Sequence, residues 1–184
     1  MKKQPAHKAE PAHFKQHLIF TGGTIDSRFA GNLDTVVPTR KSAIPELLTK
    51  FVMIPKDRNK MTTLYMKDSR NLDEPQLRAL LAAVVESSCR QVIITIGTYA
   101  MPDVARYLEV ALTETDKVIV LTGSIVPITG FTPTDAPFNL GFAMAKAEHL
   151  KKGVYVAMNG QVLLPNEVFK HFRTASFRSI RSRP

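Results

Sequence analysis

The chain has 184 residues, of which 44% are hydrophobic, and it carries a formal net charge of +9. A chain of this size can bury one full hydrophobic core, so the sequence predicts one compact domain. The single cysteine, Cys89, excludes a disulfide framework, a CxxC redox pair and a thiolate zinc cluster, and it fits a cytoplasmic location. No apolar run of signal-peptide length follows the basic first residues, so we expect neither secretion nor membrane insertion.

The positive charge lies mainly at the two ends of the chain. Residues 1–17 carry a net +3 and residues 170–184 a net +5, whereas residues 18–169 hold 16 basic and 15 acidic side chains. Such a balanced body has no basic face for binding phosphates, so no nucleic-acid partner is expected. We interpret residues 1–16 as a basic, disordered tail and the last charges as solvated.

The body of the chain alternates short apolar runs with amphipathic stretches, which is typical of βαβ units. Strands are predicted at 17–21, 62–66, 91–96, 117–122 and 153–158. Helices are predicted to begin at 73–75, 102 and 136–137, where a capping carboxylate or a proline precedes apolar residues at helical spacing. We therefore expect a doubly wound α/β fold over 17–180, with a mostly parallel sheet, helices on both faces and a ligand crevice at the carboxyl ends of the strands.

The loop after the first predicted strand reads Thr21-Gly22-Gly23-Thr24-Ile25. Its glycines allow backbone N–H groups to approach a ligand closely. Taken alone, the loop is more simply a tight turn capped by Thr21. A phosphate site is a weaker alternative, because neither a GxGxxG spacing nor a Gly-Lys-Ser/Thr ending is present.

Two further strand ends carry groups suited to catalysis. The strand at 91–96 is followed by Gly97 and Thr98 ahead of a helix, and backbone donors at such a position can stabilise an oxyanion. Lys117 precedes the next apolar strand, and a buried lysine there would act as a general base. The plainer alternatives are a helix cap for Thr98 and a solvated strand end for Lys117.

Taken together, six ordered segments resemble the L-asparaginase family. Residues 21–25 resemble its TGGTI signature, Asp68-Ser69 its substrate loop, and residues 94–101 its ITHGTDTM segment. The similarity continues at 117–124 with K-x-VVLTGA, at 135–141 with SDAPFNLG, and at 153–160 with GVYIAMNG. The co-occurrence of these blocks is far more specific than any one of them.

The resemblance implies hydrolysis of the side-chain amide of asparagine or a related small amide, with release of ammonia. Thr21 would be the nucleophile, and Thr98 and Lys117 would assist proton transfer. The substrate would be held by Asp68, Ser69, Gly97 and the residue at position 99. No cofactor and no metal are implied.

The chain also resembles the short-form members of the family, which lack a C-terminal asparaginase domain. A single open α/β domain leaves its crevice uncovered, so we expect a homodimer or homotetramer.

The sequence departs from the family pattern at two positions. Ile96 replaces a histidine, and Tyr99 replaces the aspartate that binds the substrate's ammonium group. A phenol is neutral at pH 7 and cannot balance an ammonium charge. Phe29 is the nearest aromatic residue to the place of a mobile tyrosine that the family carries. Two hypotheses follow: a working amidohydrolase with altered preference, or a small-ligand-binding protein that has lost most turnover.

Overall fold

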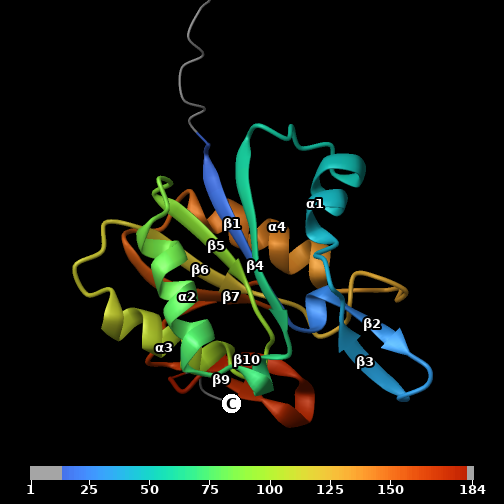
Figure 1. The fold of residues 1–184 in the computed structure, drawn as a ribbon. Helices are drawn as coiled ribbons and strands as arrows, with labels where there is room; N and C mark the ends of the chain where they lie inside the picture. The colour runs from blue at the N-terminus through green and yellow to red at the C-terminus, as the bar shows by residue number, and fades with distance from the viewer. Residues whose placement is uncertain (1–13, 182–184) are drawn as a thin grey trace, which may run out of the picture.

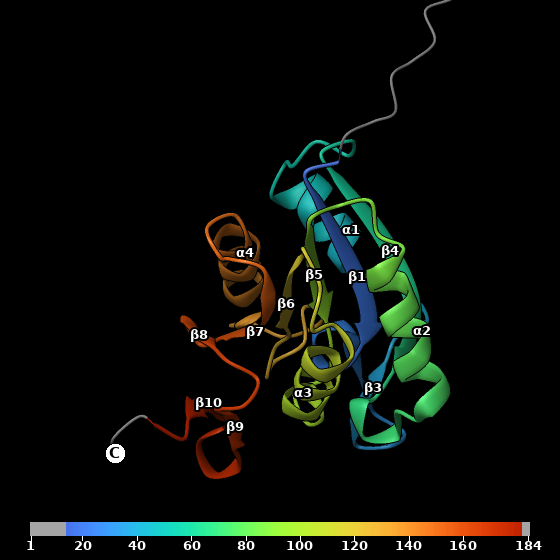
Figure 2. The same ribbon diagram turned by 90° about the vertical axis from the view of Figure 1, so that its left-hand side faces the viewer.

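The computed structural model describes residues 14–181, so most of the tail predicted at 1–16 lies outside the described residues. A six-stranded sheet forms the centre, in the order β4-β1-β5-β6-β7-β8. The first five of these strands run parallel to their neighbours and β8 is antiparallel to β7, and Figure 2 shows this order from β8 on the left to β4 on the right. The strands are β1 (Gln16–Gly22), β4 (Asn59–Lys67), β5 (Gln91–Thr95), β6 (Val118–Thr122), β7 (Gly153–Met158) and β8 (Gln161–Leu163).

Helices cover both faces of the sheet. The helices α2 (Glu74–Val85) and α3 (Met101–Ala111) pack on one face. Helix α4 (Ala136–Ala147) packs on the other face together with the short α1 (Ile44–Glu46), which continues as the π-helical turn η2 (Leu47–Phe51). Each of the three long helices has a proline in its first turn, where the missing N–H costs no hydrogen bond. Helix α2 also begins with a capping box between Asp73 and Gln76.

The core alternates along the strands with a period of two. Ile19 in β1 packs with α2 and α3, whereas its neighbours Leu18 and Phe20 pack with α1 and α4. Because both faces are covered, every residue of β1 is buried, and its centre reads as a continuous apolar run. The predicted fold class, the five predicted strands and the three predicted helices are confirmed.

Two short hairpins outside the main sheet were not predicted. The strands β2 (Ser27–Ala30) and β3 (Thr35–Pro38) pair with each other, and so do β9 (Val168–His171) and β10 (Ser176–Ser179). Figure 1 shows both hairpins near the lower end of the sheet, toward which β1 and β4 point. The expectation of a purely solvated charged tail from residue 170 onward was wrong, because β9 and β10 pack against the domain through the buried Val168 and Phe177.

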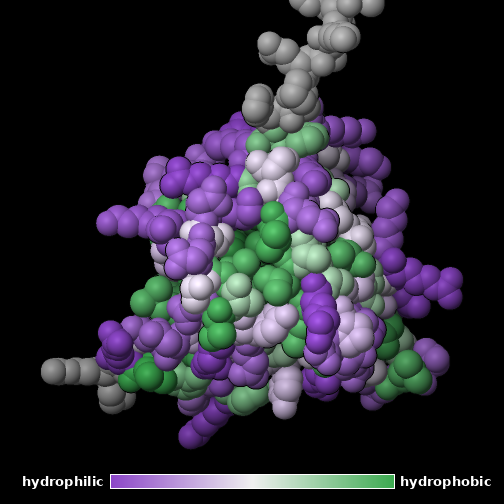
Figure 3. Space-filling model, turned by 60° about the vertical axis from the view of Figure 1, so that its left-hand side comes forward, coloured by the Kyte–Doolittle hydropathy of each residue, from purple (hydrophilic) through white to green (hydrophobic). Residues whose placement is uncertain are grey.

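The surface is largely polar, and Figure 3 shows hydrophobic side chains gathered in the middle of one face with hydrophilic ones around them. Within residues 14–181, no helix is long and apolar enough to cross a membrane. The same residues contain no group of three or more histidine, cysteine, aspartate and glutamate side chains that could hold a metal ion.

Candidate functional site

The connections of the sheet create one switch point, between β1 and β5. The chain leaves β1 toward β4 on one side and leaves β5 toward β6 on the other. The loops at the carboxyl ends of β1 and β5 therefore diverge, and such a divergence forms the ligand crevice of open α/β sheets. A pocket of about 170 Å³ lies at this place. Its lining residues are Gly23, Thr24, Ser27, Val36, Asp68, Ser69, Arg70, Gly97, Thr98, Tyr99 and Lys170.

The glycines after Thr21 turn the chain and place Thr24 on the pocket wall. Gly22 and Gly23 have φ angles of +88° and +80°, which favour glycine, and a Cβ on Gly23 would collide with the backbone of Gly97. The chain then enters a 3-10 turn, η1 (Thr24–Asp26), that begins at Thr24. Within the described residues, the Thr24 side chain makes no hydrogen bond, so its hydroxyl is available to a ligand.

Thr21, to which the resemblance assigns the reacting hydroxyl, lies in β1 near its carboxyl end. Its side chain is buried, and its hydroxyl donates to the carbonyl oxygen of Thr95 over 2.7 Å. Thr21 is thus at the switch point but is not among the residues that line the pocket. The structure offers two hydroxyls from one motif, one buried at the strand end and one on the pocket wall.

Ser69 and Asp68 approach from the end of β4. Asp68 precedes the 3-10 turn η3 (Ser69–Asn71), and its carboxylate accepts a hydrogen bond from the backbone N–H of Arg70 at 2.9 Å. Ser69 is buried against Gly97, where a Cβ would collide with the serine side chain. Its hydroxyl accepts from the backbone N–H of Ala100 at 3.3 Å. The predicted residues Asp68, Ser69, Gly97, Thr98 and Tyr99 thus come together in one pocket.

A lysine that was expected among the solvated charges completes this wall. Lys170, in β9, donates from Nζ to the hydroxyl oxygen of Thr98 over 2.7 Å. Burial lowers the pKa of Lys170, and the positive charge of Arg70 lowers it further. A lysine with a lowered pKa next to a hydroxyl is suited to proton transfer.

Lys117 does not reach the site. It directly precedes Val118, the first residue of β6, and its Nζ donates to the carbonyl oxygen of Ser87 over 2.7 Å. That position is the amino end of a parallel strand, and the pocket lies at the carboxyl ends, so a length of strand separates the two. Lys117, predicted in the catalytic set, therefore lies away from the pocket, and the lysine beside Thr98 is Lys170.

Two exposed aromatic residues, Tyr99 in the pocket lining and Phe172 next to it, lie beside the pocket. Tyr99 is 55% exposed and its ring centroid lies 5.9 Å from that of Phe172, which is 66% exposed. Lys170 Nζ lies 5.5 Å from the ring centroid of Phe172. The β2–β3 hairpin contributes Val36 to the lining, whereas its cross-strand partner Phe29 does not line the pocket.

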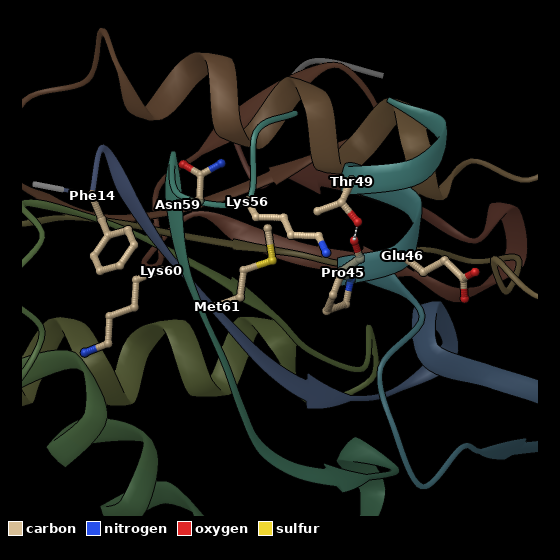
Figure 4. A pocket seen from close by; sticks show the side chains of 8 residues that line it. All are labelled: Phe14, Pro45, Glu46, Thr49, Lys56, Asn59, Lys60 and Met61. Carbon is tan, nitrogen blue, oxygen red and sulfur yellow. Dashed lines mark hydrogen bonds between the residues drawn. The ribbon is translucent and has the colours of Figure 1, made fainter. Parts of the chain in front are cut away.

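A larger hollow of about 510 Å³ lies elsewhere, along the edge strand β4. Figure 4 shows Phe14, Lys60 and Met61 on one side of it and Pro45, Glu46 and Thr49 on the other. Its one hydroxyl, that of Thr49, donates to the carbonyl oxygen of Pro45 over 2.7 Å. The hollow is remote from the switch point and has no paired hydroxyl and lysine, so the smaller pocket is the better candidate for chemistry.

The fold and the pocket define a doubly wound α/β protein with threonine hydroxyls, a serine and a partly desolvated lysine at its switch point. The sequence matches the family model described as Asparaginase, N-terminal, over residues 16–184. The chain therefore belongs to the asparaginase family. No curated protein sequence matches the chain at a significant level.

Solved structures of L-asparaginases share this fold. The thermostable L-asparaginase from Thermococcus kodakarensis is 27% identical with a TM-score of 0.75, and the match covers 92% of this chain and 52% of that one. A structure described as "Probable Cytoplasmic L-asparaginase" from Campylobacter jejuni is 25% identical with a TM-score of 0.75, covering 91% and 53%. L-asparaginase I from Vibrio cholerae has a TM-score of 0.77 at 19% identity, covering 93% and 53%, and supports the fold alone. The chain spans about half the length of these structures.

Proposed function

We propose that the protein hydrolyses the side-chain amide of a small carboxylic acid, such as asparagine or a related compound, to the acid and ammonia. The observation that carries the proposal is the 2.7 Å hydrogen bond from Lys170 Nζ to the Thr98 hydroxyl, in a pocket at the switch point of the sheet. Membership of the asparaginase family supports the same reaction.

In this mechanism Thr21 is the nucleophile, as the resemblance of residues 21–25 to the family signature implies. Its hydroxyl must leave the Thr95 carbonyl and turn toward the pocket, a rotation about χ1 between staggered rotamers. Thr24, on the pocket wall, then donates to or accepts from the substrate. Thr24 is also the second candidate for the nucleophile, because its hydroxyl is already available in the pocket.

The reaction proceeds through an acyl-enzyme. Thr21 Oγ1 attacks the carboxamide carbon while its proton passes to Thr98, whose own proton passes to the neutral amine of Lys170. The tetrahedral intermediate then collapses, the C–N bond breaks, and the proton returns through the same pair to the leaving nitrogen, which departs as ammonia. Division of the reaction at an acyl-enzyme replaces one difficult step by two easier ones.

Water completes the reaction. It attacks the ester carbon of the acyl-Thr21 and gives its proton to the Thr98–Lys170 pair, and the Thr21 oxygen regains a proton as the acid leaves. Negative charge on the carbonyl oxygen develops beside the loop of Gly97 and Thr98, which leads into the amino end of α3. The exposed N–H groups at a helix start favour such a charge.

The proposed assembly is a cytoplasmic homodimer or homotetramer with no nucleic-acid partner. The exposed aromatic rings of Tyr99 and Phe172 at the pocket mouth support a second subunit as a cover. The buried, unpaired Cys89 fits a reducing compartment, and the similar Campylobacter jejuni protein is described as cytoplasmic.

The test is an ammonia-release assay on a panel of small amides with wild type, Lys170→Gln and Lys117→Gln. Lys117 is a matched control, because it too donates one hydrogen bond over 2.7 Å but lies at the other end of the sheet. We expect Lys170→Gln to lose about 10²-fold or more in kcat, as is typical for a residue in proton transfer, and Lys117→Gln to keep wild-type turnover. Equal losses in the two variants would contradict the proposal.

Absence of ammonia release from every amide of the panel, with retained binding of the same compounds, would instead support the alternative of a small-ligand-binding protein. Isothermal titration calorimetry on the same samples separates these two results. The panel contains asparagine, glutamine and amides without an amino group.

A further inference from the structure

The charges of the pocket point to the kind of substrate it accepts. Its lining includes two cationic side chains, Arg70 and Lys170, and among the lining residues Asp68 carries the only carboxylate. The pocket wall is therefore positive overall while Lys170 is protonated, and an anionic group on a ligand is attracted to it.

The carboxylate of Asp68 is already engaged by Arg70. The guanidinium donates from Nη2 to Oδ2 at 2.6 Å and from Nε to Oδ1 and Oδ2 at 3.1 Å each. The backbone N–H of Arg70 adds a further hydrogen bond to Oδ1 at 2.9 Å. Both carboxylate oxygens thus have donors, and Arg70 holds the pKa of Asp68 below its usual range. An ammonium group entering the pocket would find no free carboxylate on its wall.

The remaining groups near Lys170 are neutral or aromatic. Tyr99 carries a phenol, and Phe172 packs against both the Tyr99 ring and the Lys170 ammonium. An ammonium group on a substrate in this pocket would lie near the guanidinium of Arg70, and also near the charge of Lys170 while that lysine is protonated. Like charges at short range in a partly desolvated pocket disfavour its binding.

We propose that the preferred substrates are amides of carboxylic acids that carry no α-ammonium group, with succinamate as the simplest example, and that Arg70 and Tyr99 determine this preference. Arg70 attracts the free carboxylate while Asp68 fixes its guanidinium, and Tyr99 offers a neutral ring where an ammonium ligand would otherwise stand. The inference rests on the proposed function for the hydrolytic step only, because the preference itself is a property of binding.

Binding of the reaction products tests the preference without turnover. Calorimetry on the wild-type protein compares succinate with L-aspartate, and steady-state kinetics compares succinamate with L-asparagine and 3-aminopropanamide, which has an ammonium group and no carboxylate. We expect succinate and succinamate to be favoured by about tenfold or more, because the ammonium group of each competing ligand meets a like charge and finds no free carboxylate on the pocket wall. Equal or tighter binding of L-aspartate would overturn the inference.

Variants at Arg70 and Tyr99 test whether these residues determine the substrate preference. Arg70→Gln is expected to lose about tenfold or more in succinate affinity, whereas Arg78→Gln, which breaks a comparable exposed ion pair with Glu74 on α2, should leave it unchanged. Tyr99→Asp should reverse the preference toward L-asparagine, and the exposure of Tyr99 means that the variant should fold. If Arg70→Gln and Arg78→Gln bind succinate alike, Arg70 has no such role.

Failure of the proposed hydrolytic function and failure of the proposed substrate preference would give different results. A protein that binds succinate over L-aspartate but releases no ammonia from any amide disproves the hydrolytic function and keeps the preference. A protein that hydrolyses L-asparagine better than succinamate keeps the function and disproves the preference.

Discussion

At the scale of single residues, two threonines three positions apart have different surroundings. Thr21 is buried with its hydroxyl on the Thr95 carbonyl, and Thr24 lines the pocket. We expect Thr21→Ala to abolish the acyl-enzyme. Thr24→Ala should keep the acyl-enzyme and raise KM by up to about tenfold, because one neutral hydrogen bond contributes about 0.5–1.5 kcal/mol.

Mass spectrometry of substrate-quenched protein and steady-state kinetics measure these two effects. Thr21→Ser is the control, since it keeps a hydroxyl at the strand end and should still form the adduct. A covalent adduct that persists on Thr21→Ala and disappears from Thr24→Ala would transfer the role of nucleophile to Thr24.

The protonation state of Lys170 makes turnover depend on pH. Lys170 must be neutral to accept a proton, and burial and the charge of Arg70 both lower its pKa from the ordinary 10.5. We therefore expect kcat to rise with pH along a limb that lies below 10.5. Arg70→Gln removes a positive charge that disfavours protonated Lys170, so the limb should move to higher pH. A kcat profile measured on succinamate with both proteins checks this shift, and a limb that stays in place or moves to lower pH would exclude the coupling.

The sequence alone led to five of the pocket residues, but it pointed to Lys117 where the structure places Lys170 beside Thr98. Asp68, Ser69, Gly97, Thr98 and Tyr99 follow strands whose patterns are strong, and they meet because parallel strands end at one edge of the sheet. Lys170 lies in a short segment with no periodic pattern. The available signal was its setting in Val168-Phe169-Lys170-His171-Phe172, since three large apolar residues are unusual in a solvated tail.

At the scale of elements, the amino end of β1 contains a buried polar cluster that links β1, β4 and the segment after α2. His17 is 2% exposed, its Nδ1 lies 2.9 Å from the Ser87 hydroxyl and its Nε2 lies 2.9 Å from the Thr62 hydroxyl. Burial first, and the charge of Lys60 second, lower the pKa of His17 from 6.5 to about 4. The neutral ring is therefore the form that the fold stabilises.

This cluster predicts acid sensitivity. The folded pKa lies below the unfolded value, so the contribution of His17 to stability is complete above pH 6.5 and is lost as the pH falls from 6.5 toward 4. A tenfold difference in proton affinity between the folded and unfolded chains corresponds to about 1.4 kcal/mol, so the loss should reach a few kcal/mol. Urea denaturation at a series of pH values checks this, with His17→Gln as the control that should show a flatter dependence in the same window. A wild-type curve as flat as that of His17→Gln would disprove it.

Elements were predictable where burial on both faces imposes a pattern. The strand β5 has four consecutive buried residues, and helix α3 has buried apolar residues over more than one turn. The bounds of both elements fall within a residue or two of the prediction. The hairpins β2–β3 and β9–β10 have strands of four residues that are only partly buried. Their conformation depends on pairing with each other and on contacts with the domain, which short local patterns do not encode.

At the scale of the whole molecule, the open pocket mouth predicts self-association. Tyr99 and Phe172 present two exposed rings beside it, and a partner subunit would bury them and exclude water from the site. We expect light scattering at micromolar concentration to give the mass of a dimer or a tetramer. Phe172→Ser should weaken the association and lower kcat together. A monomer with unimpaired turnover would contradict this prediction.

The way in which the β9–β10 hairpin is attached allows it to open locally. This hairpin carries Lys170, yet its two strands pair with each other and not with the main sheet. Its hydrogen bonds to the domain include one from Arg106 Nη2 to the Val168 carbonyl oxygen at 2.7 Å and one from the Phe177 N–H to Asn159 Oδ1 at 2.9 Å. A segment held in this way can open without unfolding the sheet, with a smaller free energy than global unfolding. Amide hydrogen exchange in β9 and β10 should therefore be faster than in β5 and β6, and each opening would carry the lysine away from Thr98. Such local opening would switch the site between an assembled and a disassembled state while the rest of the molecule stays folded.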